Sequence, residues 1–217
     1  MEKIEPMAEF FARRVGMYDE HMLTDVEGCK EGYTKMVELI PLECENLLDL
    51  GCGTGLELDF IFEKLPHLSV TGIDLSPEML SALSKKHPDK DIELICDDYF
   101  KADLGETVFD CAVSFQTMHH FRKEKKEELY KKIHKALKSG GLYIECDYMV
   151  EAQAEEDFWF SENARIRKEQ GIGEDEFYHY DTPCTIENQI ELLKKGGFTS
   201  VSKVFRMENT TMLVARK

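Results

Sequence analysis

Short apolar runs alternate with amphipathic stretches through the middle of this chain. The runs are Asn46–Leu50, Leu68–Asp74, Ile92–Cys96, Phe109–Phe115 and Leu142–Cys146. Runs of this length fit buried strands, and the stretches between them repeat apolar residues at helical spacing. Strands that alternate with helices form βαβ units around a parallel sheet. The sequence therefore predicts a three-layer α/β/α fold of the Rossmann-like type, with a mostly parallel sheet.

Two helix starts are marked by capping residues. Ser76 before Pro77 is typical of an N-cap with proline at the first helical position, and it predicts a helix that ends near Lys86. Thr185 is expected to cap a second helix, which runs to Lys195.

The two ends of the chain flank this alternating region. Before it, apolar residues at three- and four-residue steps predict one helix from Ile4 to Met22, and a second is expected over Cys29–Ile40. After it, Val201–Arg206 and Thr211–Ala215 predict an antiparallel hairpin.

We therefore expect a single domain in four parts, and its length of 217 residues suits one core. The parts are an N-terminal helical cap (1–40), a βαβ core (41–148), a helical insertion (149–184), and a last helix with the hairpin (185–217).

The composition excludes several classes of partner. The formal net charge is −16, from 27 Lys and Arg against 43 Asp and Glu, so nucleic acid and anionic membranes are not expected to bind. No apolar stretch has the length of a membrane span or a secretory signal. The seven cysteines include no CxxC pair, so we expect neither disulfides nor a metal site, and we place the protein in the reducing cytoplasm.

A glycine-rich turn lies between the first predicted strand and the following helix, in the sequence LLDLGCGTGLEL. Glycines at positions 51, 53 and 55 allow positive φ and a close approach of backbone N–H groups to a ligand. Asp74 ends the second strand, where a carboxylate can accept both hydroxyls of a ribose. The alternative is that Asp74 caps the next helix, but Ser76 already has that role.

The loop differs from the dinucleotide fingerprint GxGxxG, because Leu56 stands where the third glycine would be. Asp49 precedes the first glycine, and its charge would repel a phosphate and attract a cationic amino-acid group. These two residues favour a sulfonium amino acid joined to a ribose over NAD.

With these motifs, the stretch from Asn46 to Tyr148 resembles the class I S-adenosylmethionine-dependent methyltransferases. The resemblance implies a seven-stranded sheet whose last strand is antiparallel, with S-adenosylmethionine as cofactor. It assigns the methionine moiety to Asp49, Gly51, Cys52, Gly53 and Gly55, and the ribose to Asp74. For the adenine and the sulfonium it implies contacts from Leu75, Met79, Asp97, Asp98, Tyr99, Ser114 and Phe115, and Tyr18 is expected to cover the cofactor.

The resemblance also implies that the insertion 149–184 is a substrate lid. Trp159, Tyr178 and Tyr180 are its candidate substrate contacts, although aromatic residues at such spacing also fill cores and interfaces. His119 and His120 follow the fourth strand, where acceptor and methyl group meet. They are either catalytic, with a general base among them, or a structural pair that orders the loop.

We therefore predict a methyltransferase that acts on a small molecule by direct in-line transfer. The alternatives are a non-catalytic S-adenosylmethionine-binding scaffold, an NAD-dependent oxidoreductase, and a superfamily enzyme that modifies the cofactor itself or a protein acceptor. The expected partner is a small-molecule substrate, and a homodimer is left open.

Overall fold

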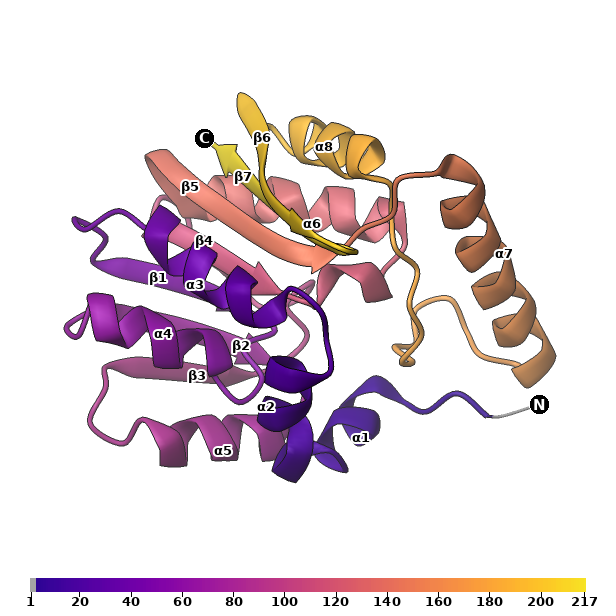
Figure 1. Cartoon of the computed structure of the whole chain (residues 1–217), viewed down its shortest axis with the longest axis horizontal. Coiled ribbons are helices and arrows are strands. Elements are labelled where there is room, and N and C mark those ends of the chain that lie inside the picture. Colours follow the sequence, from indigo (N-terminus) through magenta and orange to yellow (C-terminus); the bar gives the residue numbers. More distant parts are fainter. Residues whose placement is uncertain (1–2) are drawn as a thin grey trace.

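The computed structural model describes residues 3–217, and they form one mixed sheet with helices on both faces (Figure 1). Within these residues the sheet has seven strands in the order β3-β2-β1-β4-β5-β7-β6. The neighbours among β1 to β5 pair in parallel, and β7 is antiparallel to both β5 and β6. The strands are β1 (Asn46–Leu50), β2 (Ser69–Asp74), β3 (Ile92–Cys96), β4 (Phe109–Phe115), β5 (Leu137–Tyr148), β6 (Ser200–Met207) and β7 (Thr210–Arg216). The predicted fold class, including the antiparallel C-terminal hairpin, is confirmed.

The helices of the described residues differ in their distance from the sheet, and α7 stands apart from it at one side of the molecule (Figure 1). They are α1 (Met7–Ala12), α2 (Val15–Thr24), α3 (Cys29–Leu39), α4 (Leu56–Lys64), α5 (Pro77–Lys86), the short 3-10 helix η1 (Met118–His120), α6 (Lys123–Ala136), α7 (Gln153–Gln170) and α8 (Ile186–Lys195). None of those within residues 3–217 combines the length and hydropathy that a membrane crossing needs.

Both predicted caps are confirmed. The Ser76 hydroxyl accepts a hydrogen bond from the Met79 amide at 3.3 Å, and the Thr185 hydroxyl accepts one from the Asn188 amide at 3.2 Å. Each bond satisfies one of the free N–H groups in the first turn, which fixes where α5 and α8 begin.

The N-terminal helix is shorter and more divided than predicted. It splits into α1 and α2, with a tight turn between Ala12 and Val15. Arg14 sits in this turn at φ −109° and ψ −1°, and the local bonds run from Arg14 N–H to the Phe11 carbonyl and from Met17 N–H to the Arg14 carbonyl, each 3.0 Å long. These three-residue bonds redirect the chain, so α2 leans on the glycine loop while α1 lies beside α5.

Strand β5 is longer than the predicted run Leu142–Cys146, because it begins at Leu137 and ends at Tyr148. Gly140 has a φ of +76°, and a side chain on Gly141 would lie 3.0 Å from the Asp110 carbonyl oxygen. The two glycines therefore permit an irregular start of β5 against β4.

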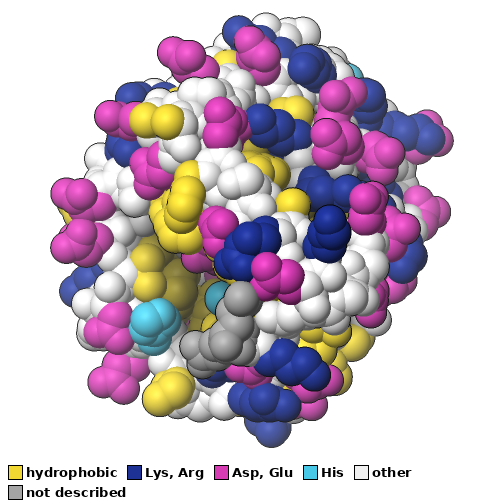
Figure 2. All heavy atoms as spheres, turned by 90° about the vertical axis from the view of Figure 1, so that its right-hand side faces the viewer, with side chains coloured by type: hydrophobic (Ala, Val, Ile, Leu, Met, Phe, Trp, Pro, Cys, Tyr) yellow, Lys and Arg dark blue, Asp and Glu magenta, His cyan; other side chains and the backbone are white. Residues whose placement is uncertain are grey.

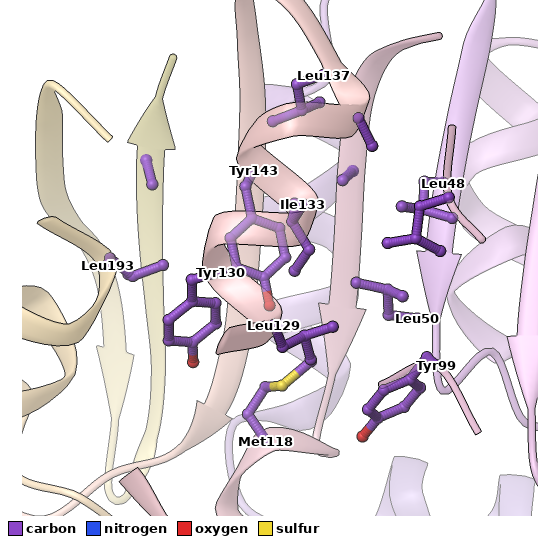
Figure 3. Close-up of a cluster of buried hydrophobic side chains, with 14 of the residues drawn as sticks. Leu48, Leu50, Tyr99, Met118, Leu129, Tyr130, Ile133, Leu137, Tyr143 and Leu193 are labelled. Carbon is purple, nitrogen blue, oxygen red and sulfur yellow. The ribbon is translucent and has the colours of Figure 1, made fainter. Parts of the chain in front are cut away.

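Apolar clusters lie on both faces of the sheet. On one face, α6 contributes Leu129, Tyr130 and Ile133, which point toward the middle of the sheet in Figure 3, and α8 contributes Leu193, which lies beside the C-terminal strands. The other face is covered by α3, α4 and α5. Within residues 3–217 both faces of the sheet are therefore covered, and we expect a ligand at the ends of its strands.

The order of the strands defines where a ligand can enter. The chain leaves β1 toward β2 on one side, whereas it leaves β4 toward β5 on the other. A crevice forms outside the carboxyl ends of two adjacent strands when their connections diverge in this way, and such crevices are the usual binding sites of open α/β sheets. The predicted site residues follow these strand ends.

Candidate functional site

The glycine loop joins β1 to α4 and is held by the neighbouring strand. The amides of Gly51 and Cys52 both donate to the Ile73 carbonyl oxygen of β2, at 2.8 and 3.2 Å. Gly51 has a φ of +72°, and a side chain there would begin 2.6 Å from the Thr117 hydroxyl oxygen. Gly53 has a φ of +47°, with no neighbouring atom closer than 3.9 Å to a side chain placed on it. Hydrogen bonds and close contacts thus fix the loop at Gly51, whereas the space next to Gly53 can admit a ligand.

Asp49 is the most unusual residue of the loop region. Its side chain is 0% exposed, and neither carboxylate oxygen has a hydrogen-bond partner of acceptable geometry within residues 3–217. Burial raises the pKa of Asp49 to about 7, and the nearby charge of Asp74 adds to the effect. Glu57 is buried beside it, and its pKa is also raised, by burial and by the charge of Asp49. A cationic ligand would stabilise this group of carboxylates.

Asp74 closes β2 and contacts the loop directly. One carboxylate oxygen accepts a hydrogen bond from the Gly53 amide at 3.0 Å, and the other accepts one from the Ser76 amide at 2.8 Å. Asp74 therefore holds the glycine loop and orders the residues just before α5, whereas the cap of α5 is Ser76; its contact with a ribose stays a prediction. Each carboxylate oxygen keeps a further lone pair that a ribose hydroxyl can use.

Helix α2 covers the loop from the side of the crevice. The Thr54 hydroxyl donates to an Asp19 carboxylate oxygen at 2.5 Å, and the other Asp19 oxygen pairs with the Lys86 ammonium at 2.8 Å. Tyr18 lies next to this contact, and its pKa is raised by burial and by the charges of Glu57 and Asp74. The structure thus brings Tyr18 to the predicted cofactor site.

The residues after β3 lie at the same end of the sheet. Asp97 is exposed, whereas Asp98 is buried, accepts a hydrogen bond from the Phe100 amide at 2.9 Å and pairs with Lys101. The Tyr99 hydroxyl is 3.1 Å from that of Thr117, which follows β4. Tyr99 therefore links the ends of β3 and β4 across the crevice.

Three of the proposed cofactor contacts have side chains that belong to the core. The Ser114 hydroxyl is 2.7 Å from the Tyr143 hydroxyl, and Phe115 stacks on Tyr33 with the ring centres 3.8 Å apart. The Cys52 sulfur packs against Gly72 of β2. Only the backbone of these three residues is free to face a cofactor, because their side chains are committed to packing.

Leu75 and Met79 complete the predicted adenine wall. Leu75 is half-buried, and the Met79 methyl group lies 4.0 Å from the position of a side chain on Gly53. Both residues therefore remain next to the loop, at the start of α5.

A cavity of about 910 Å³ opens beside the N-terminal helices. Figure 2 shows a hollow on this face of the molecule, with hydrophobic side chains at its wall and a histidine at its rim. Residues of α1 and α2 line one side, and the other side is formed by His119, His120, Tyr148, His179 and Asp181. The volume suits a small molecule.

His119 and His120 face this cavity from η1, where the sequence placed the acceptor. His119 Nδ1 lies 2.7 Å from a carboxylate oxygen of Asp147 at the end of β5. Although burial opposes the charged form, the Asp147 and Asp181 carboxylates raise the pKa of His119 to about 9. The pKa of His120 is lowered instead, by burial and by the charge of His119.

The candidate substrate residues of the insertion are divided between two environments. Trp159 and Tyr180 line a second cavity of about 540 Å³, which also touches Arg14, Tyr148 and Asp181. Tyr178 pairs with Pro6 through a backbone bridge and lines neither cavity. Trp159 and Tyr180 are therefore the two of these aromatic residues that can contact a small molecule.

The sequence analysis did not identify three acidic or polar residues that contact His119 and hold it in place. Asp147 and Asp181 both lie next to His119, and Thr182 donates from its amide (2.7 Å) and its hydroxyl (2.9 Å) to the His119 carbonyl oxygen. Asp147 directly follows the predicted strand Leu142–Cys146, and the sequence HYD contains Asp181, but nothing in the spacing indicates that these segments meet.

Comparison with known proteins agrees with this geometry. Residues 47–141 match the family model described as "Methyltransferase domain". The human N-acetylserotonin methyltransferase in complex with S-adenosylmethionine superposes with a TM-score of 0.69 at 16% identity, over 97% of this chain but only 56% of that longer chain. The complex of DhpI with S-adenosylhomocysteine superposes with a TM-score of 0.70 at 16% identity, over 96% of this chain and 94% of DhpI.

Curated relatives match the chain along nearly its whole length. The carboxy-S-adenosyl-L-methionine synthase of Nautilia profundicola is 26% identical over 99% of this chain and 96% of its own. The synthase of the same name from Nitratiruptor is 27% identical over 99% and 95%. Residues 47–141 therefore match a methyltransferase domain, and the chain has the fold of the class I S-adenosylmethionine-dependent methyltransferases, as its motifs predicted.

Proposed function

We propose that this enzyme transfers the methyl group of S-adenosylmethionine to a small neutral or cationic acceptor held in the 910 Å³ cavity. The observation that carries the proposal is the position of His119 and His120, which line this cavity at the carboxyl end of β4, beside the crevice that holds the glycine loop. Tyr18 lines this cavity and lies next to the contact between Asp19 and Thr54 of the loop, so we expect a methyl group carried by a cofactor on the loop to face the cavity.

The cofactor-site residues of this chain fit S-adenosylmethionine. The buried carboxylate of Asp49, which makes no hydrogen bond of regular geometry within residues 3–217, suits the ammonium group of an amino acid, and Asp74 suits a ribose. Once bound, the cofactor supplies an electrophilic methyl group on a sulfonium. The protein's own contribution is to hold the acceptor in line with that methyl group and to exclude water, which Tyr18 and the rest of α2 support by covering the loop.

The charge of the cavity favours a neutral or cationic acceptor. Its lining includes the acidic residues Glu20, Asp25, Glu27, Asp181 and Glu208. Arg14 is the one Lys or Arg side chain among the described residues of the lining, and it already pairs with a carboxylate of the N-terminal segment at 3.2 Å. An anionic acceptor would meet net repulsion.

A second candidate is the addition of a carboxyl group to the cofactor, which the full-length match to carboxy-S-adenosyl-L-methionine synthases favours. Such a reaction needs a cation that pairs with the new carboxylate. Arg14 lines both cavities and is the side chain best suited to this role. The acidic lining argues for methyl transfer as the first candidate.

The experiment is an analysis of products by mass spectrometry. The purified protein is incubated with S-adenosylmethionine and a small-metabolite extract, in parallel with Asp74→Ala as the inactive control. Methyl transfer predicts S-adenosylhomocysteine together with a product heavier by one methyl group, both reduced in the variant. A cofactor heavier by a carboxyl group would establish the second candidate and refute the first.

We also propose a reducing compartment such as the cytoplasm, which the absence of disulfides supports, since the seven cysteines are free. The single-domain organisation in the four parts given above, and a homodimer, remain proposals that a sedimentation experiment with limited proteolysis can examine.

A further inference from the structure

Three potential metal ligands converge at the floor of the cavity. One nitrogen each of His119 and His120 and one carboxylate oxygen of Asp181 all lie within 4.8 Å of one another. The Asp181 oxygen is 3.5 Å from His119 Nε2 and 3.4 Å from His120 Nδ1. Two ligands at about 2.0–2.1 Å from a zinc ion in tetrahedral geometry are separated by about 3.3–3.4 Å. The two distances therefore match ligands that share one ion better than they match direct hydrogen bonds.

Two of these ligand atoms lack other partners. His120 Nδ1 and the same Asp181 oxygen are buried and make no hydrogen bond of acceptable geometry within residues 3–217. Buried polar atoms are nearly always satisfied, so an unpaired nitrogen that faces an unpaired oxygen calls for a group between them. A metal ion would satisfy both.

The surroundings hold the ligands as a metal site requires. Asp147 contacts His119 Nδ1 at 2.7 Å, which leaves Nε2 of the same ring facing Asp181. A carboxylate that orients the far nitrogen of a histidine is the usual support of a histidine–metal bond. Thr182 ties the segment that carries Asp181 to the His119 carbonyl oxygen through two hydrogen bonds. The three ligands are thus preorganised although they come from distant parts of the chain.

We propose that His119, His120 and Asp181 bind a divalent transition-metal ion, and that its open position takes the oxygen or sulfur nucleophile of the methyl acceptor. Two imidazoles and one carboxylate favour zinc, cobalt or a similar ion over magnesium. All three ligands line the 910 Å³ cavity, so the fourth position opens toward the acceptor. The sequence led us to expect no metal, because it shows no CxxC pair and the ligands meet only in the fold.

This inference rests on the proposed methyl transfer and specifies the class of acceptor. On the metal, a hydroxyl or thiol group releases its proton to water in the cavity. The resulting oxygen or sulfur anion attacks the methyl carbon, the carbon–sulfur bond of the cofactor breaks, and the electron pair leaves with S-adenosylhomocysteine. A metal ion that lowers the pKa of the bound hydroxyl or thiol group would explain how a neutral acceptor becomes nucleophilic in a cavity lined by carboxylates.

Metal binding is tested on the full chain, with any affinity tag removed and after dialysis against a chelator. Co²⁺, Zn²⁺ and Mg²⁺ are titrated, and the visible absorption of bound Co²⁺ reports its coordination. We expect one ion per chain with nitrogen and oxygen ligands, and at least a tenfold weaker affinity in Asp181→Asn and in His120→Asn. Asp181 has 44% of its side chain exposed, so its isosteric replacement is expected to fold.

Two control variants sharpen the result. Asp25→Asn removes the carboxylate of another histidine–aspartate pair, with His21 at the exposed rim of the same cavity, and it should bind Co²⁺ as the wild type does. Cys96→Ser removes an exposed thiol and should also leave binding unchanged. The proposal is overturned if the wild type binds no Co²⁺, if Mg²⁺ binds in preference, or if Asp181→Asn and His120→Asn bind Co²⁺ as the wild type does.

A parallel titration with S-adenosylhomocysteine separates this inference from the function on which it rests. If S-adenosylhomocysteine binds and Co²⁺ does not, the metal site alone is refuted. If S-adenosylhomocysteine fails to bind, the proposed methyl transfer is refuted, and with it the proposed role of the metal in activating the acceptor, whether or not Co²⁺ binds.

Discussion

Replacement of Asp49 by asparagine should stabilise the unliganded protein and abolish tight cofactor binding. The carboxylate is fully buried, lies beside the buried Glu57 without a hydrogen bond of regular geometry within residues 3–217, and has its pKa raised from 3.8 to about 7. A shift of this size corresponds to about 4 kcal/mol of lost stability when the group is ionised. Asparagine removes this charge but keeps an unpaired amide, at a cost of about 1–3 kcal/mol. We therefore expect a net gain of about 1–3 kcal/mol at pH 8.

The gain in stability of Asp49→Asn over the wild type should increase with pH. Because the pKa of Asp49 is higher in the folded protein, ionisation of this group costs the wild type stability as the pH rises from 3.8 toward 7, and Asp49→Asn lacks that cost. Urea unfolding at pH 8 and pH 5.5 measures the difference, which should shrink at the lower pH. Calorimetry with S-adenosylhomocysteine should show an affinity at least thirtyfold weaker, equivalent to about 2 kcal/mol. A variant that is less stable at pH 8, or that binds as tightly as the wild type, would refute the reasoning.

Three further predictions concern capping, packing and proton linkage. Ser76→Ala should lower the free energy of unfolding by about 1 kcal/mol in urea, because the hydroxyl caps α5, and an unchanged midpoint would contradict this. Gly196→Ala should lower the free energy of unfolding by at least about 2 kcal/mol in the same assay, because the new carbon would lie 2.5 Å from Tyr130 Cβ. The control Gly16→Ala in α2 meets nothing within 4 Å and should be neutral or stabilising. Equal effects of the two substitutions would contradict the close packing of α6 against Gly196. Binding of S-adenosylhomocysteine at pH 7 should release about half a proton, because an ammonium group next to Asp49 favours its ionised form; calorimetry in two buffers of different ionisation enthalpy measures this, and the idea fails if no proton is released.

The sheet was predictable because local patterns determine it. The predicted bounds of β1, β3 and β4 agree with the structure, since each is a short apolar run between turn residues. The break between α1 and α2 was not predictable from periodicity, because both helices continue one apolar stripe. It depends on Arg14, which pairs with the N-terminal segment and donates to the Phe10 carbonyl oxygen.

The two parts of the candidate site, the glycine loop region and the histidine cluster, also differ in how far the sequence could predict them. The glycine loop and Asp74 lie at the ends of two predicted strands that are consecutive in the sequence, so the candidate cofactor residues could be named from the sequence. The cluster around His119 joins η1, the end of β5 and the segment after α7, and only the tertiary fold brings Asp147 and Asp181 to the histidines. The directions of the Ser114 and Phe115 side chains could not be predicted either. The sequence of β4 does not show which of its side chains face the crevice and which pack in the core.

The most direct test of the account is calorimetric titration of the wild type, Asp74→Ala and the exposed control Asp89→Ala with S-adenosylmethionine, S-adenosylhomocysteine and NAD. We predict that the wild type and Asp89→Ala bind both sulfur nucleosides and not NAD. In Asp74→Ala the affinity should fall at least tenfold, because the ribose hydroxyls lose their acceptor. Undiminished binding by Asp74→Ala, or a preference of the wild type for NAD, would contradict the cofactor site described above.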